Sequence, residues 1–159
     1  MPNTNYLNNL ADEPVVIRIN DDAAPFDNGQ VETGWHSGLT TGKFAGKNSS
    51  ANVVEADAAA AVQIPALGVL TYDARNSYSV AGKTGNKDYN FVDMYHDSIV
   101  VKLGTGLTLT PGQPIWLSSG GGITQTHPAV IGNIRQQLGF AISTTEFSVH
   151  VCDAETMGI

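Results

Sequence analysis

The stretch from Thr105 to His127, TGLTLTPGQPIWLSSGGGITQTH, constrains the fold more than any other part of the chain. Its first part, Leu107–Thr110, alternates apolar and hydroxyl side chains, which is the period of a half-buried strand. The next four residues, Thr110–Gln113, have the sequence TPGQ. Proline sets φ at about −65° in the second position of a turn, and glycine accepts a positive φ in the third. These residues therefore predict a type II turn.

Two more strands are predicted in the same stretch. Ile115–Ser118 is the first, with Trp116 as packing bulk, and Ile123–Thr126 is the second. Gly120–Gly122 lie between them and allow the chain to reverse without steric cost. Three short strands joined by two tight turns predict a scaffold rather than catalytic apparatus.

The rest of the chain is also rich in strand signals. Asp57–Val62 (DAAAAV) predicts only a turn of helix or a linker, because about six residues cannot hold a helix alone. Asn20–Gly29 predicts a loop, and Asp73–Tyr89 a long polar loop. Short apolar or alternating segments predict further strands at Val15–Ile19, Val53–Glu55, Ala66–Tyr72 and Ile99–Leu103, the last with Lys102 pointing outward.

The C-terminal part predicts a long hairpin. Ile134–Ser143 alternates apolar and polar residues, Thr144–Glu146 turns the chain, and Phe147–Val151 alternates again. One face of the first strand is expected to carry Ile134, Gln136, Leu138, Phe140 and Ile142.

These elements predict an all-β fold of about eight to ten strands with almost no helix. The expected architecture is a small antiparallel β-barrel or β-tulip-like domain. Residues 1–14 are expected to form an extended N-terminal arm, residues 15–152 the domain and residues 153–159 a C-terminal tail.

Composition excludes several classes of partner. Charged residues make up only 14% of the 159-residue chain, against about 25% in ordinary domains. The net charge is −7 and the eight basic residues are scattered, which argues against binding to nucleic acid. Cys152 is the single cysteine, so no intrachain disulfide is possible. The sequence shows neither a signal peptide nor an apolar run of membrane-spanning length, so we expect a soluble protein made in the cytoplasm.

No group of residues predicts catalysis. Gly82-Lys83-Thr84 lacks the earlier glycine of a phosphate-binding loop, because Ser77 stands at that position. Asp93, His96 and Asp97 could ligate zinc or manganese, but a solvated or capping role is expected more often.

Other candidate residues are equally incomplete. His150 and Cys152 would supply two ligands, whereas a zinc site needs three or four. We therefore predict no catalytic residue, no cofactor and no metal, and the sequence assigns no role to His36, His96, His127 or His150.

Four segments of the chain resemble the capsid decoration, or head cement, proteins of tailed phages. Their sequences are ALGVLTYDA at Ala66–Ala74, LTPGQPIWLSSGGGIT at Leu109–Thr124, LGFAI at Leu138–Ile142 and FSVHV at Phe147–Val151. Together they span roughly Ala66 to Val151. The resemblance is one of turn and strand order rather than a diagnostic motif.

The resemblance implies a structural virion protein of the outer capsid surface. Members of the family are not enzymes and need no cofactor. They assemble as trimers on the expanded head, clamp the major capsid protein lattice, often through an N-terminal arm, and resist internal pressure. In this chain the expected contact residues are Tyr6, Leu7 and Leu10 of the arm and Arg75, Tyr78 and Lys83 of the long polar loop. We expect neither nucleic acid nor membrane as a partner.

Two other classes remain open at the level of the sequence. A β-rich adhesin or tail-fibre module that binds a host surface glycan would be favoured by a patch built from Trp35, Tyr72 and Tyr78. An enzyme with a jelly-roll or similar barrel would use the Asp93, His96 and Asp97 group, and bound zinc or manganese would favour it.

Overall fold

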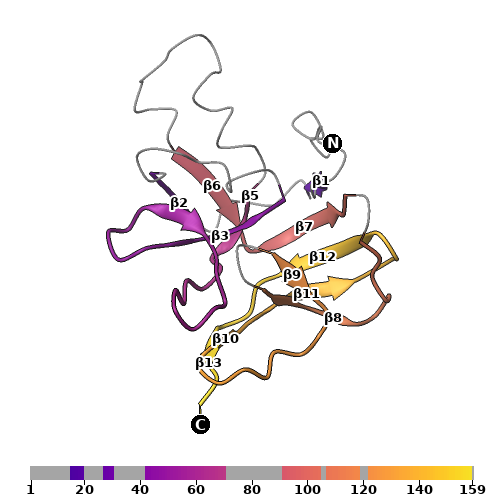
Figure 1. Ribbon diagram of the computed structural model, residues 1–159. Coiled ribbons are helices and arrows are strands. Elements are labelled where there is room, and N and C mark those ends of the chain that lie inside the picture. Colours follow the sequence, from indigo (N-terminus) through magenta and orange to yellow (C-terminus); the bar gives the residue numbers. More distant parts are fainter. Residues whose placement is uncertain are drawn as a thin grey trace.

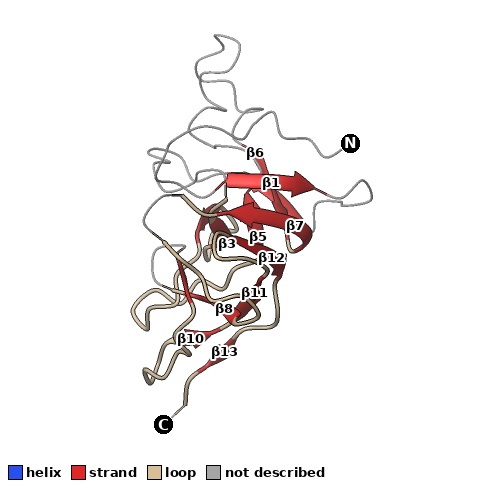
Figure 2. Cartoon of the chain, turned by 90° about the vertical axis from the view of Figure 1, so that its right-hand side faces the viewer, coloured by secondary structure: helices blue, strands red, loops and turns tan. Residues whose placement is uncertain are grey.

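The described part of the protein folds as β-structure. The computed structural model describes the backbone of residues 15–19, 27–30, 42–70, 91–104, 107–118 and 122–158, and the side chains of these residues except in 15–19, 27–30 and 91–93. In these ranges every regular element is a strand (Figure 2), which confirms the all-β prediction. The described part has no helix long and apolar enough to cross a membrane.

The larger sheet is antiparallel and has six strands in the order β1-β7-β12-β11-β8-β9 (Figure 1). It contains the terminal hairpin from Gln137 onward and the predicted pair on either side of the glycine run, whereas the first residues of the predicted hairpin strand, Ile134 and Arg135, belong to another sheet. Its strands are β1 (Val15–Ile19), β7 (Asp97–Lys102), β8 (Pro114–Leu117), β9 (Ile123–Thr124), β11 (Gln137–Ala141) and β12 (Glu146–His150).

A second antiparallel sheet has five strands in the order β2-β6-β5-β3-β4, and a third has only two strands. The five strands are β2 (Asp27–Gln30), β3 (Phe44–Lys47), β4 (Val53–Glu55), β5 (Gly68–Leu70) and β6 (Phe91–Tyr95). The small sheet pairs β10 (Ile134–Arg135) with β13 (Glu155–Thr156) beside the C-terminal end (Figure 1).

The chain passes between the two large sheets at one corner. Only His96 separates β6 of the five-stranded sheet from β7 of the six-stranded sheet. Next to it, Ser98 has a φ of 62°, which is uncommon for a residue other than glycine. The pairing of β7 with β12 shifts register at Val149/His150. Such irregularities allow one strand to leave a sheet and enter the next.

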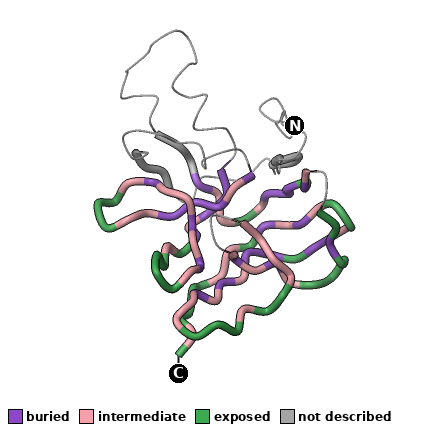
Figure 3. Tube along the Cα trace, in the orientation of Figure 1, coloured by how far each residue is buried: buried purple, intermediate pink, exposed green. Residues whose placement is uncertain are grey.

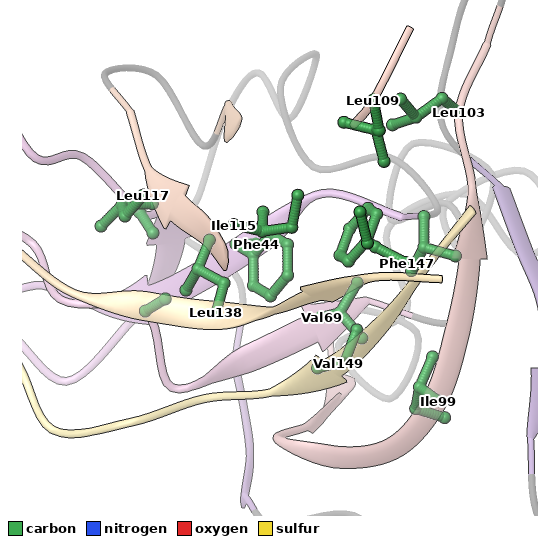
Figure 4. Close-up of a cluster of buried hydrophobic side chains, with 14 of the residues drawn as sticks. Phe44, Val69, Ile99, Leu103, Leu109, Ile115, Leu117, Leu138, Phe147 and Val149 are labelled. Atoms are coloured by element: carbon green, nitrogen blue, oxygen red, sulfur yellow. The ribbon is translucent and has the colours of Figure 1, made fainter. Parts of the chain in front are cut away.

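The main core lies between the two large sheets. The Phe44 ring of β3 stacks on the Phe147 ring of β12, with centroids 6.2 Å apart. Val69 of β5 joins the same cluster (Figure 4). From the six-stranded sheet the cluster takes the inward side chains of four strands: Ile99, Val101, Ile115, Leu117, Leu138, Ala141, Phe147 and Val149. Burial of this apolar surface holds the sheets face to face.

β5 is buried on both faces, as its sequence predicts. Val69 faces the main core, whereas Leu70 joins a second cluster with Ala45, Val53 and Met94. Gly68 is required here for a steric reason, because a Cβ atom on it would lie 2.7 Å from the carbonyl oxygen of Tyr95. The glycine thus allows β5 and β6 to pair.

The described strands form open sheets rather than the closed barrel expected from the sequence. The larger sheet ends at β1 and β9, and the other at β2 and β4. The physical reason is the corner at His96. It divides consecutive strands between two layers, and these bury their apolar faces against each other instead of curling into one ring.

Several local predictions are corrected or sharpened. Leu107–Thr110 is not a strand: Leu107 is exposed, and only Leu109 is buried in the core. Asp27–Gly29, predicted as loop, belongs to β2. Asp57–Val62 holds a single turn, in which Val62 N and Gln63 N both donate to Ala59 O.

Two further predictions concern the C-terminal half. The predicted tail contributes β13, which pairs with β10. The type II turn at Thr110–Gln113 is confirmed: Gln113 N donates to Thr110 O at 3.3 Å, and Gly112 has a φ of 80°.

Candidate functional site: the outer face of the six-stranded sheet

The six-stranded sheet presents a second face, opposite its core, that carries exposed apolar side chains. Phe140 is 49% exposed and Ile142 is 48% exposed. The sequence pattern predicts both on the same face as the buried Leu138. That prediction is wrong, and the reason is a change of phase inside β11.

The phase changes because β11 contains a bulge. Gln137 is paired with Trp116 of β8, and Gly139 with the adjacent Ile115, so two steps along β11 match one step along β8. Leu138 and Gly139 are both buried, whereas the next residue, Phe140, is exposed. A bulge places an extra residue in one strand and reverses the alternation beyond it. Phe140 therefore points away from the core.

Gly139 makes this arrangement possible. Its φ is 150°, a conformation that other residues rarely adopt, and a Cβ atom on it would lie 1.9 Å from the carbonyl oxygen of Ser148. The glycine lets β11 approach β12 closely enough for Gly139 to pair with Val149. A glycine inside a strand pattern is the sequence signal for such a bulge. Exposure of Phe140 could have been inferred from it.

The immediate neighbours of Phe140 are uncharged. Its register partners are Pro114 on β8 and Ser148 on β12, both partly exposed. The nearest ionisable residues on the strands beside it are Glu146 and His150, each two residues from Ser148. An exposed aromatic ring with uncharged neighbours and ionisable groups farther out has the layout of a protein interface, with an apolar centre and a polar rim.

Trp116 extends the same face. Its neighbours Ile115 and Leu117 are buried in the core, so the alternation of β8 directs Trp116 outward. The indole is half-buried and meets the exposed His127 ring edge-on, with centroids 4.8 Å apart. Trp116 is thus not core packing bulk but part of the outer face, and His127 has a contact that the sequence did not suggest.

His150 and Asp97 meet where β12 and β7 pair. His150 Nδ1 lies 3.4 Å from Asp97 Oδ2, and Asp97 Oδ1 accepts a hydrogen bond from Ser98 N. Both side chains are more than half exposed. The contact occupies Asp97, which the sequence grouped with Asp93 and His96 as possible metal ligands. Among the residues with described side chains, no three His, Cys, Asp or Glu lie together as a metal requires.

Glutamine side chains hold the segments beside this face. The Gln125 amide exchanges two hydrogen bonds with the backbone of Thr110, at 2.8 and 3.0 Å, and so ties the type II turn to the segment after β9. On the core side, the buried Gln136 makes an equivalent pair with Ala66. In each case the glutamine amide accepts a hydrogen bond from the N–H and donates one to the C=O of the same residue, as a neighbouring strand would.

The contact residues expected from the sequence lie outside the described part of the chain. These are Tyr6, Leu7, Leu10, Arg75, Tyr78 and Lys83. Trp35, His36 and Tyr72 and the Gly82-Lys83-Thr84 segment also lie outside it, as does the side chain of Asp93. Their roles stay predictions.

Three of the four segments that carry the family resemblance lie side by side. Leu109–Thr124 supplies β8 and β9, Leu138–Ile142 most of β11, and Phe147–Val151 most of β12. These strands are consecutive in the six-stranded sheet. The fourth, Ala66–Ala74, supplies β5 and with it Val69, which packs in the same core. The resemblance therefore falls on one continuous unit, and the candidate face is its outer surface.

Comparison with known proteins adds no relative: no protein-family model matches the chain, and no curated protein is significantly similar to it.

Proposed function

We propose that the protein is a structural virion protein, a decoration or cement protein that binds the outer surface of a phage head and stabilises the major capsid protein lattice. Copies are expected to associate as homotrimers. The observation that carries the proposal is the candidate face: an exposed phenylalanine with uncharged strand neighbours, held outward by the bulge at Gly139.

Rigidity of the face supports a binding role. Phe140 lies on a strand paired on both sides, by β12 and by β8. Because its backbone is already ordered, binding to a partner would lose little conformational entropy at this position. Aromatic side chains, phenylalanine included, are enriched at protein interfaces relative to the rest of the surface. Repetition over a lattice then multiplies the effect of each modest contact.

The second support is the resemblance of the strand and turn order to that of capsid decoration proteins, and this resemblance is the reason for proposing the capsid as the partner. It points to the capsid surface, and the low charge of the chain suits a wide protein–protein contact. The arm at residues 1–14 and the loop Asp73–Tyr89 would add contacts beyond the described face. Deletion of residues 1–14 is expected to abolish attachment and leave the domain folded.

Electron microscopy of reconstituted heads tests the proposal. Expanded heads of the phage that encodes the chain, assembled without it, are mixed with the purified protein and imaged. Regular added density at three-fold positions is the expected result. A lattice that stays bare at high protein concentration would contradict it. The matched control is Phe140→Asp, which should bind weakly although it is folded.

One observation favours the glycan-binding alternative, namely the half-buried Trp116 with His127 against its ring. Indole rings on open surfaces stack on apolar faces of ligands. A glycan array probed with wild type and Trp116→Ala separates the two readings. Glycan binding that is lost in Trp116→Ala, together with bare heads, would favour the adhesin class.

A further inference from the structure

We infer that two apolar turns at the C-terminal end of the domain form the contact between copies of this chain. They are the turn at 59–63 and the turn at 130–133. Three β-branched side chains stand out from them: Val62, Val130 and Ile131 are 50%, 62% and 59% exposed. Both turns contain exposed residues (Figure 3). We call these three side chains the apolar tip.

The two turns are tied to each other and to the domain. Ala60 N donates to Asn133 Oδ1 at 2.9 Å, and Gln63 Nε2 donates to Gly132 O. A Cβ atom on Gly132 would lie 3.1 Å from the Cβ of Ala60, so the turns are in contact. The apolar tip is thus one ordered surface built from two distant segments.

The base of the tip is equally ordered. Both backbone groups of Met157 bond to the second turn: Gly132 N donates to Met157 O, and Met157 N donates to Asn133 O. Gln63 has a φ of 52°, a conformation that is strained for a residue other than glycine. These contacts hold three apolar side chains toward solvent, where each loses the free energy of burial. A binding partner recovers that free energy.

Charge identifies the partner as a second copy. The chain has a net charge of −7, so most faces of two copies would bring acidic groups together. The tip avoids this repulsion. No Asp, Glu, Lys or Arg occurs between Asp57 and Asp73 or between Lys102 and Arg135, the two segments that contain the turns. At the border, the Asp57 carboxylate accepts a hydrogen bond from Ala59 N at 2.8 Å, and Arg135 forms an ion pair with Glu155.

Symmetry strengthens the argument. In a symmetric contact between identical copies, residues next to the symmetry axis meet their own counterparts, so a charge placed there would lie close to the same charge. An uncharged, apolar and ordered surface avoids this repulsion. The inference deepens the proposed function, since it names the surface through which copies meet and rests on the self-association included there.

Sedimentation velocity over a range of concentrations tests the inference on the protein alone. The wild type is expected to associate, and Val130→Asp/Ile131→Asp to raise the dissociation constant by about tenfold or more, because buried charge at a contact centre costs more than about 1.4 kcal/mol. Phe140→Asp, the same type of change on the other face, should associate as the wild type does. A wild type that stays monomeric, or a double variant that associates normally, would overturn the inference.

Cross-linking gives a second measurement that does not depend on the aspartate variants. In a Cys152→Ser background, Ile131→Cys is expected to give covalent dimers with a short bismaleimide and Phe140→Cys is not. Equal yields from both would refute the inference.

Lattice binding separates the inference from the proposed function. If the double variant loses attachment to heads but associates normally, the tip binds capsid protein and the inference is wrong. If heads stay bare but tip-dependent association is seen, the inference stands and the proposed function fails.

Discussion

Gln136 and Ala66, 70 residues apart in sequence, exchange two hydrogen bonds of 2.8 Å between the glutamine amide and the alanine backbone. The amide nitrogen also donates to Cys152 O at 2.9 Å. Gln136 is only 3% exposed, yet its carbonyl oxygen and both its amide hydrogens have partners. One side chain therefore joins the segment just before β5, the break between β10 and β11, and the segment after β12.

Replacement of Gln136 by leucine is expected to destabilise the protein by about 3 kcal/mol or more. Two buried backbone groups of Ala66 and the partly buried carbonyl of Cys152 would lose their partner, and each unsatisfied buried group costs roughly 1–3 kcal/mol. Gln125→Leu is the matched control, because Gln125 makes the same two-bond contact with Thr110 where water can replace it. Its cost should stay below about 1 kcal/mol. Urea unfolding measures both, and equal losses would contradict the role assigned to burial.

Gly139→Ala is expected to cost more than about 3 kcal/mol or to prevent folding. The added Cβ would lie 1.9 Å from Ser148 O, and strain at positive φ adds about 1 kcal/mol or more. Gly112→Ala separates the two causes. Gly112 also has a positive φ, but nothing lies within 4 Å of a Cβ there, so only strain should appear. Thermal unfolding of both variants is the measurement, and a mild Gly139→Ala would show that the bulge is not needed.

Phe140→Asp is expected to weaken attachment to heads while changing stability by less than about 1 kcal/mol, because the ring is already half exposed. Leu138→Ala is the contrast two residues away. Leu138 is fully buried, so its truncation should cost about 2–5 kcal/mol and affect binding only through folding. Pelleting with heads and thermal unfolding are measured in parallel. Normal attachment of Phe140→Asp would remove the face from the interface.

Glu55 should make the stability of the protein depend on pH. Burial raises the pKa of its carboxyl above the ordinary value; Lys43, with Nζ 3.8 Å away, opposes the shift, and Asp57 adds to it. The folded state therefore holds this proton more tightly than the unfolded state. The contribution of Glu55 to stability is fully present below the ordinary pKa and is lost as pH rises through the raised value.

Glu55→Gln tests this dependence. Relative to the variant, the wild type should lose stability as the pH rises from the ordinary pKa of glutamate through the raised pKa of Glu55. Urea unfolding of both proteins at several pH values gives the difference. A difference that is constant with pH, or that changes in the opposite direction, would contradict the assignment.

Strand positions could be predicted because their signals are local. β1, β4 and β5 lie within segments whose period or apolar run predicts a strand, and β12 overlaps such a segment in all but its first residue. β2 could not, since Asp27–Gln30 carries turn residues and pairs only because β6 lies beside it. Propensity yields to tertiary pairing in such a strand.

The candidate face and the apolar tip were beyond sequence reasoning for a related reason. Periodicity places Phe140 with Leu138, and only the pairing with β8 and β12 shows that the alternation reverses between them. The tip needs the contact of Gln63 with Gly132, 69 residues away in sequence. Neither relationship leaves a periodic signal.

The stretch Thr105–His127 shows where the boundary lies. The sequence by itself determined the turn at Thr110–Gln113 and the pairing of β8 with β9, because proline and glycine restrict φ locally and a short loop sets the partner. Only the tertiary structure decided that Trp116 and Phe140 face outward. The face of a side chain depends on strand register, and register is settled by how two layers fill the space between them.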